Sequence, residues 1–154
     1  SSKSSRDVWV LSMAGDLKPF PFLNATFNER SSVFSPDGHW VAYDSDESGR
    51  REIYVRPFPG PGGQWQVSTA GGKDPRWGPD GKELYVADYS SDEISLLLVA
   101  ANGTLTEAAG SPFPASVDAP DYFPITIAPA SRSFSGSCPP RPSSRSIGQT
   151  RSSS

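Results

Sequence analysis

Short apolar runs separated by turn residues alternate along most of this chain. The run Trp40–Tyr43 is rich in β-forming residues and follows the tight-turn sequence Ser35–Gly38, in which proline, aspartate and glycine occupy positions that they favour in turns. Apolar runs of this length that are bounded by turns are typical of buried strands. A polar loop then leads to a further predicted strand, which starts at Ile53.

The same plan recurs further along the chain. Trp77–Gly81 repeats the turn, Leu84–Ala87 repeats the strand, and Leu96–Val99 follows a second polar loop. Pro36 and Pro79 are equivalent, so the step is 43 residues. A repeat of that length with several short strands in each unit is typical of a propeller blade. We therefore predict an all-β fold: a partial β-propeller with about two full four-stranded antiparallel blades, a leading half blade and a degenerate trailing strand.

The first blade piece, predicted at 7–27, begins in the middle of the repeat. Asp7–Met13 aligns with Glu52–Phe58, the third strand of the central repeat, and no proline-aspartate-glycine turn precedes it. Lys18–Phe27 fits a fourth, outer strand, because its two prolines are tolerated at a sheet edge. The chain is therefore expected to open with the outer half of a blade.

The other blade pieces are predicted at 31–69, 75–114 and 122–130, with connections at 28–30 and 70–74. Together with the first piece they form one predicted domain over 7–130. The flanking segments are expected to be disordered, because both are polar and contain few apolar residues. These segments are the N-terminal residues 1–6 and the tail 131–154, which is rich in serine, arginine and proline.

Composition and charge narrow the function classes. Aromatic residues make up 11% of the chain, which also has 14 glycines and 16 prolines, as suits a turn-rich β protein. Its basic residues do not cluster on an aromatic strand, so no nucleic-acid partner is predicted. No apolar run approaches about 18 residues, so no membrane span is predicted. Cys138 is the only cysteine, which excludes an intrachain disulfide and a cysteine zinc site.

The repeat residues resemble a known family. FSPDGHWVAYDSDESG (34–49) and EIYV (52–55) are similar to the PDG-type repeat of TolB-like β-propellers. The segment PFPGPGGQWQVSTAGGKDPRWGPDGKELYV (57–86) resembles the propellers attached C-terminally to bacterial receptor-type serine/threonine protein kinases. The resemblance covers roughly 7–114 and, faintly, 122–134. It implies a closed ring of typically six blades and a place on the periplasmic or extracellular side of a bacterial membrane.

Propeller geometry sorts the polar residues into two opposite faces. Turns between strands one and two, and between strands three and four, lie on one face; the other loops lie on the opposite face. The turn residues are expected to be structural; they are Pro36, Asp37, Gly38, Pro79, Asp80 and Gly81. The opposite face is the candidate ligand surface. Its predicted residues are Asn28, Glu29, Arg30, Asp46, Glu47, Arg50, Arg51, Lys73, Asp74 and Arg76. The alternative is a solvated face with local ion pairs.

Other candidate chemistry is weaker. Asp37 and Asp80 resemble a carboxylate pair, but their repeated position indicates turn formation. Asp44–Glu47 contains three carboxylates without the remaining spacing of a calcium loop. His39 is the only histidine and lacks the partners of a metal site or catalytic triad. Hydrolase, kinase and phosphate-loop motifs are absent from the sequence, so no catalytic residue, cofactor or metal is predicted.

Aromatic side chains recur at strand spacing, and we expect them to pack between blades rather than form a sugar-stacking row. They are Phe34, Trp40, Tyr43, Tyr54, Trp65, Trp77 and Tyr85.

Three functional hypotheses follow. The first is a non-catalytic binding or scaffold module, part of a kinase-associated sensor propeller, whose partner is a protein, peptide or cell-envelope ligand or the remaining blades. The second is an accessory propeller of a prolyl-oligopeptidase-type serine peptidase. The third is a nonfunctional fragment. Kinase motifs in upstream coding sequence, or a G-x-S-x-G domain downstream, would discriminate the first two.

Overall fold

The computed structural model describes residues 6–88, 90–115 and 127. The predicted trailing strand at 122–130 falls outside them except for residue 127, as do residues 1–5 of the N-terminal segment and the whole tail 131–154. The described residues form strands, turns and loops and no helix. None of them therefore belongs to a helix that could cross a membrane.

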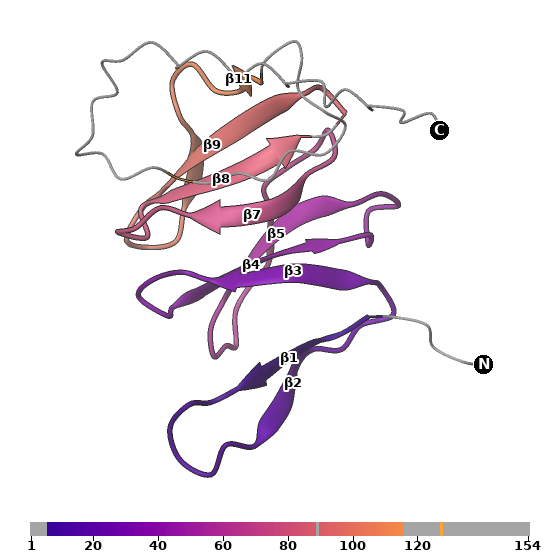
Figure 1. The fold of residues 1–154 in the computed structure, drawn as a ribbon, viewed down its shortest axis with the longest axis vertical. Helices are drawn as coiled ribbons and strands as arrows, with labels where there is room; N and C mark the ends of the chain where they lie inside the picture. Colours follow the sequence, from indigo (N-terminus) through magenta and orange to yellow (C-terminus); the bar gives the residue numbers. More distant parts are fainter. Residues whose placement is uncertain (1–5, 89, 116–126, 128–154) are drawn as a thin grey trace, which may run out of the picture.

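The strands form three antiparallel sheets stacked along the longest axis of the molecule (Figure 1). Blade 1 consists of β1 (Val8–Leu11) and β2 (Pro19–Leu23). Blade 2 consists of β3 (Glu29–Phe34), β4 (Trp40–Ser45), β5 (Glu52–Pro57) and β6 (Trp65–Gln66). Blade 3 consists of β7 (Lys73–Trp77), β8 (Glu83–Asp88), β9 (Glu93–Val99), β10 (Leu105–Glu107) and β11 (Phe113–Pro114).

This architecture confirms the predicted all-β, open partial propeller. In blade 2, and over β7–β10 of blade 3, each strand pairs with its neighbour in sequence, in the order of a four-stranded blade. The outer edge of blade 3 is divided between two short strands, because β10 pairs with the C-terminal part of β9 and β11 pairs with its N-terminal end. The half blade at the start of the chain contains only the two outer strands.

Apolar side chains between the sheets hold the blades together. Ala42, Ile53 and Val55 of blade 2 pack against a buried set in blade 3; that set is Leu84, Val86 and Leu97. The other face of blade 2 packs against blade 1, through Val41, Tyr43 and Tyr54 of blade 2 and Val8 and Leu23 of blade 1. The sheets of blades 2 and 3 thus each have one face toward the preceding blade and the opposite face toward the position of the next blade.

The two repeated turns have the same geometry. Gly38 and Gly81 adopt φ of 74° and 72°, the left-handed region that favours glycine. Asp37 Oδ1 accepts the His39 N–H at 3.0 Å, and Asp80 Oδ1 accepts the Lys82 N–H at 3.0 Å. Both aspartates therefore close their turns through local backbone bonds.

The inner strands begin earlier than the sequence indicated. Residues 29–30 and 73–74 were expected in connections, but they belong to β3 and β7. A bulge in each strand explains the difference, because the ladder shifts register between Arg30 and Val33 and then continues. The equivalent shift in blade 3 lies between Lys73 and Arg76.

Candidate functional site

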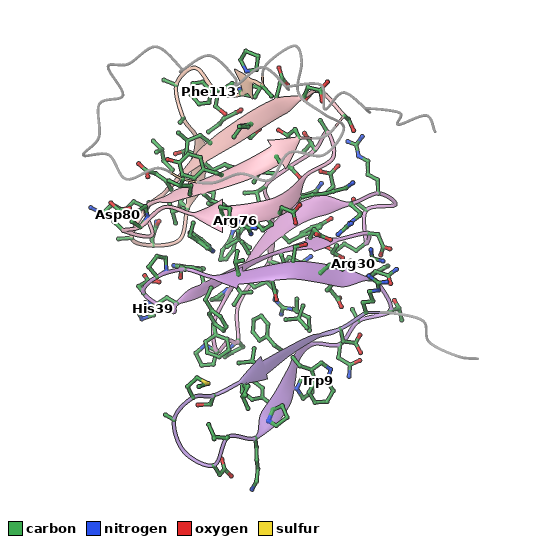
Figure 2. All side chains as sticks on the ribbon, in the orientation of Figure 1. Trp9, Arg30, His39, Arg76, Asp80 and Phe113 are labelled. Atoms are coloured by element: carbon green, nitrogen blue, oxygen red, sulfur yellow. The ribbon has the colours of Figure 1, made fainter. Side chains whose placement is uncertain are left out.

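The ends of the strands separate the molecule into the two faces predicted from the repeat. In Figure 2, Arg30 lies at one end of the sheets, whereas His39 and Asp80 lie at the opposite end. We call the end that carries Arg30 and the loop 46–51 the loop face, and the end that carries the two repeated turns the turn face. The candidate residues on the loop face fall into several separate groups.

Asn28 and Asp46 form a clasp between the entry to blade 2 and the loop after β4. Asp46 Oδ1 accepts the Asn28 backbone N–H at 2.8 Å, and Asp46 Oδ2 accepts the Asn28 side-chain amide at 2.6 Å. These bonds stabilise the ionised carboxylate and lower the pKa of Asp46 below its ordinary value. The clasp fixes the loop rather than offering its carboxylate to a ligand.

Neighbouring Glu29 is buried, with 5% of its surface exposed. Burial and, secondly, the charge of Asp7 raise the pKa of this carboxyl. Glu29 therefore belongs to the interior of the blade, although the sequence placed it on a surface loop.

Two further candidates have partners within blade 2. Arg30 pairs in register with Asp44, and Glu47 accepts a hydrogen bond from Gln64 Nε2.

Buried carboxylates hold both arginines of the loop 46–51. Arg51 donates Nε–H to Asp44 Oδ1 at 2.9 Å, and the Asp44 side chain is fully buried. Arg50 donates Nε–H to Glu52 Oε1 at 2.6 Å; the Glu52 side chain is 1% exposed, whereas that of Arg50 is 58% exposed. Fixed carboxylates behind the arginines orient them at the surface.

Glu52 also anchors the connection from blade 2 to blade 3. Its Oε2 accepts the Ser68 hydroxyl at 2.5 Å, and both carboxylate oxygens accept the Gly71 N–H, at 3.2 and 3.1 Å. Ser68 Oγ in turn accepts the Ile53 N–H at 2.8 Å. One carboxylate thus positions an arginine and the interblade connection together.

These anchored groups border a cationic cavity of about 280 Å³. Its lining comes from the loop after β4, from the interblade connection, from β7 and from the loop after β8. The residues are Arg50, Arg51, Gly71, Lys73 and Ser90. Three predicted candidates, Arg50, Arg51 and Lys73, are therefore brought to one place by the geometry. Guanidinium and ammonium donors around one hollow suit an anionic group.

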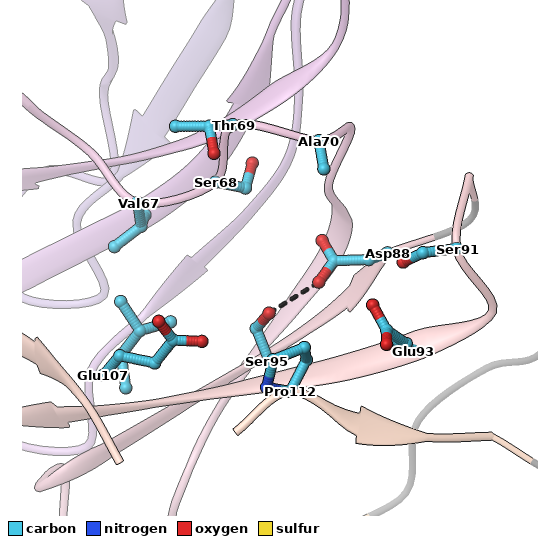
Figure 3. Close-up of a pocket in the computed structure, with 11 residues that line it drawn as sticks. Val67, Ser68, Thr69, Ala70, Asp88, Ser91, Glu93, Ser95, Glu107 and Pro112 are labelled. Carbon is cyan, nitrogen blue, oxygen red and sulfur yellow. Dashed lines mark hydrogen bonds between the residues drawn. The ribbon is translucent and has the colours of Figure 1, made fainter. Parts of the chain in front are cut away.

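A second cavity, of about 250 Å³, borders the same connection (Figure 3). It is lined by residues 67–70 of the connection and by three acidic side chains, Asp88, Glu93 and Glu107. Asp88 Oδ2 accepts the Ser95 hydroxyl at 2.5 Å. Burial, the largest cause, raises the pKa of Asp88. A cationic and an anionic hollow thus both border the connection between blades 2 and 3.

The sequence did not single out the acidic cavity. Its residues come from β8, β9 and β10, and only the pairing of these strands brings them together. A usable signal was the polar end of each strand: Asp88 closes an otherwise apolar run, and Glu93 opens the next. Polar residues at facing strand ends are expected to meet at one edge of an antiparallel sheet.

The remaining candidates lie elsewhere. Asp74 accepts the Ser31 hydroxyl at 3.2 Å, which joins the two inner strands. Arg76 lies within β7, opposite Tyr85, and donates to the Pro75 carbonyl at 3.1 Å (Figure 2). Arg76 was expected on the loop face, but the early start of β7 moves it along the strand toward the turn face.

The carboxylates of Asp44, Asp46 and Glu47 each contact a different group, Arg51, Asn28 and Gln64. Among residues 6–88, 90–115 and 127, no cluster of histidine, cysteine, aspartate or glutamate has the arrangement to hold a metal ion.

The aromatic residues are divided between interfaces and edges. Tyr43 and Tyr54 are 2% exposed between blades 1 and 2, and their ring centroids are 5.9 Å apart. Trp77 packs at the other interface and donates its indole N–H to the Val33 carbonyl at 3.2 Å. Trp65 remains 39% exposed and contacts Trp40 edge-on, with ring centroids 5.6 Å apart.

Comparisons with known proteins support the fold. A structure assigned as a TolB of Agrobacterium tumefaciens matches 66% of this chain and 40% of its own, with a TM-score of 0.51 and 17% identity. A structure from Bacteroides uniformis assigned as a 6-phosphogluconolactonase matches 82% of this chain and 40% of its own, with a TM-score of 0.53 and 25% identity. No protein-family model matches, and no curated protein matches. The chain thus has a TolB-like propeller fold and spans two fifths of these solved propellers.

Proposed function

We propose that this chain is a non-catalytic binding module, part of a sensor propeller of the kind attached to bacterial serine/threonine kinases. Its loop face takes an acidic segment of a protein or peptide ligand. The observation that carries the proposal is the cationic cavity, in which Arg50, Arg51 and Lys73 converge from two blades.

The cavity supports binding because its donors are held in place before a ligand arrives. The Glu52 bond fixes Arg50 through Nε, and the side chain remains 58% exposed to a partner. Arg51 is fixed in the same way by buried Asp44. A side chain that is already ordered loses less entropy when a ligand carboxylate binds, which favours affinity.

The neighbouring acidic cavity supports a ligand of mixed charge. Asp88, Glu93 and Glu107 disfavour a second acidic group at that position and favour a basic or hydroxyl group. Peptides offer such alternation of charge over a few residues. The two hollows together would therefore select the sequence of a peptide as well as its charge.

A labelled tetraglutamate peptide at low salt tests the proposal by fluorescence anisotropy. The double variant Arg50→Gln/Lys73→Gln removes two cations from the cavity, and we expect its affinity to fall by about tenfold, equivalent to about 1.4 kcal/mol. The matched control, Lys18→Gln/Lys82→Gln, removes two exposed cations that are not in the cavity. We expect this control to bind as the parent does.

Equal losses in both double variants would show general charge attraction and contradict a site at the cavity. A parent chain that does not bind tetraglutamate would also contradict the proposal. Circular dichroism and melting of each variant check that the fold is retained.

A further inference from the structure

A further cavity lies at the outer part of the interface between blades 2 and 3. It has a volume of about 230 Å³ and is bordered by β6 of blade 2 and by the hairpin that joins β9 to β10 in blade 3. Its aromatic and polar lining residues are Trp65, Gln66, Asn102 and Thr104. Among the described residues, none lines both this cavity and the cationic cavity, so the ligand site proposed above does not account for it.

Trp65 supplies an exposed aromatic surface at this cavity. It pairs in register with Val55, whose side chain packs in the core between blades 2 and 3, so the indole lies on the face that looks toward blade 3. Trp40 contacts it edge-on at an interplanar angle of 66°, and Trp65 stays 39% exposed. Trp65 therefore differs from the buried rings of Tyr43 and Tyr54 and can offer ring surface to a ligand.

A glycine brings the hairpin of blade 3 close to this pair of tryptophans. A Cβ atom at Gly103 would lie 2.1 Å from a carbon of the Trp40 ring, so no other residue fits there without a shift. The hairpin therefore packs directly against the indole of Trp40. This close approach places Asn102 and Thr104 of blade 3 at the same cavity as Trp65 of blade 2.

Two carboxamides at the cavity are oriented by bonds to the backbone. Asn102 Oδ1 accepts the Thr104 N–H at 3.0 Å, and Gln66 Nε2 donates to the Ser68 carbonyl at 2.8 Å. A carboxamide has a donor end and an acceptor end, and each of these bonds uses one of them. Asn102 Nδ2 can therefore donate to a ligand, and Gln66 Oε1 can accept from one.

The remaining lining residues are apolar, and they belong to the core between the two blades or pack against it. They are Val67, Leu97 and Leu105. None of the described residues that line the cavity carries a charge. An aromatic ring, two amides and a hydroxyl group favour a neutral ligand that has an apolar face and several hydroxyl groups. A pyranose ring combines these features, because its C–H bonds form an apolar face and its equatorial hydroxyl groups surround the edge.

We propose that this cavity is a carbohydrate subsite for one neutral pyranose unit with equatorial hydroxyl groups, such as β-linked glucose or N-acetylglucosamine. The sugar ring stacks on Trp65, and its hydroxyl groups bond to Asn102 Nδ2, Gln66 Oε1 and the Thr104 hydroxyl. The volume is below the roughly 300 Å³ at which sites for drug-sized ligands begin, which suits a single ring.

NMR titration of the ¹⁵N-labelled chain with cellotetraose and with chitotetraose tests the subsite. We expect at least one of these neutral β-linked sugars to shift the indole N–H signal of Trp65 and the amide signals of Asn102 and Thr104, with a saturable dependence on concentration. Trp65→Ala should weaken this binding by about tenfold, because the stacking surface is lost. The matched control is Trp9→Ala: Trp9 is 59% exposed but lies in blade 1, so the sugar should bind as it does to the parent.

Asn102→Asp separates a lost contact from a lost fold. The variant keeps an oxygen that can accept the Thr104 N–H but lacks the Nδ2 donor, so it should melt as the parent does and bind the sugar several-fold more weakly. Shifts that do not saturate, or that are as large at Trp9 as at Trp65, would overturn the proposal. So would a Trp65 signal that responds to tetraproline and to neither sugar, because proline rings stack on tryptophan but offer no hydroxyl groups to the two amides.

Discussion

Blades 2 and 3 share one plan but differ at the loop face. Both have the same turn with a left-handed glycine and the same bulge in the inner strand. Only blade 2 has buried Asp44, opposite Arg30 in the inner strand; in blade 3 the equivalent position, opposite Lys73, is Ala87. What the blades share forms the fold, and the polar groups that they do not share form the candidate site.

Removing Arg51 tests the largest difference between the blades. We expect Arg51→Ala to lower the free energy of unfolding by about 2–3 kcal/mol, because it leaves the carboxylate of Asp44 buried without its cation. The value is below that of a fully buried pair because the Arg51 side chain is 32% exposed. Urea denaturation followed by circular dichroism measures the change.

The double variant Asp44→Ala/Arg51→Ala gives blade 2 the apolar character that blade 3 has at this position. It should be more stable than Arg51→Ala alone by about 1–2 kcal/mol, since the unpaired charge is gone. Arg50→Ala is a further control: Glu52 keeps its bonds to Ser68 and Gly71, so the loss should be about 1 kcal/mol. A double variant less stable than Arg51→Ala would contradict the role given to the pair.

The repeated turns provide the opposite test, because here the blades should behave alike. Gly38→Val and Gly81→Val each force a β-branched residue into the left-handed region, and we expect each to lower stability by about 1–3 kcal/mol. Thermal melting of the two variants measures this. If one melted like the parent, the turns would not be equivalent parts of the fold.

The smallest expected effect is a difference in pKa between Asp46 of blade 2 and Asp88 of blade 3. Bonds from Asn28 lower the pKa of Asp46 below 3.8, so the ionised carboxylate stabilises the fold, and that contribution is lost as pH falls through the lowered pKa. Burial raises the pKa of Asp88 above 3.8, so stability falls as pH rises through that raised pKa. NMR titration of the carboxyl carbons should find Asp46 losing its proton first as the pH rises.

Two variants identify the causes of these shifts. Asn28→Ala should return the pKa of Asp46 toward 3.8 and leave that of Asp88 unchanged. Asp88→Asn should remove the fall in stability above pH 3.8 that Asp88 causes. Titration of Asp88 before Asp46 would contradict the burial of the acidic cavity.

The sequence predicted the parts of this fold that depend on local patterns. The repeated turns, the apolar strand runs and the edge prolines of β2 led to an open partial propeller with a leading half blade, and the structure confirms that fold. The bulges were not predicted, because nothing in the residues around Ser31 and Asp74 differs from a connection before a strand. The positive φ angles of Ser31 and Asp74, 48° and 47°, belong to the bulges in the paired strands, and these residue types do not predict them.

The candidate site was predicted less fully. Spacing placed Arg50, Arg51 and Lys73 on one face but did not show that they meet at one cavity. Glu52 was missed because its partners, Ser68 and Gly71, are 16 and 19 positions away. Such contacts depend on how the interblade connection crosses the sheet, which no local pattern encodes.

An NMR titration of the ¹⁵N-labelled chain with the tetraglutamate peptide tests most directly whether the cationic cavity binds an acidic ligand. The proposed site predicts that the largest amide shifts occur at the cationic cavity, at Arg50, Arg51, Gly71, Lys73 and Ser90. The repeated turns on the turn face should stay unshifted. Shifts centred on the turn face, or no shifts at peptide concentrations that saturate the anisotropy signal, would show that the loop face between blades 2 and 3 does not bind the acidic peptide.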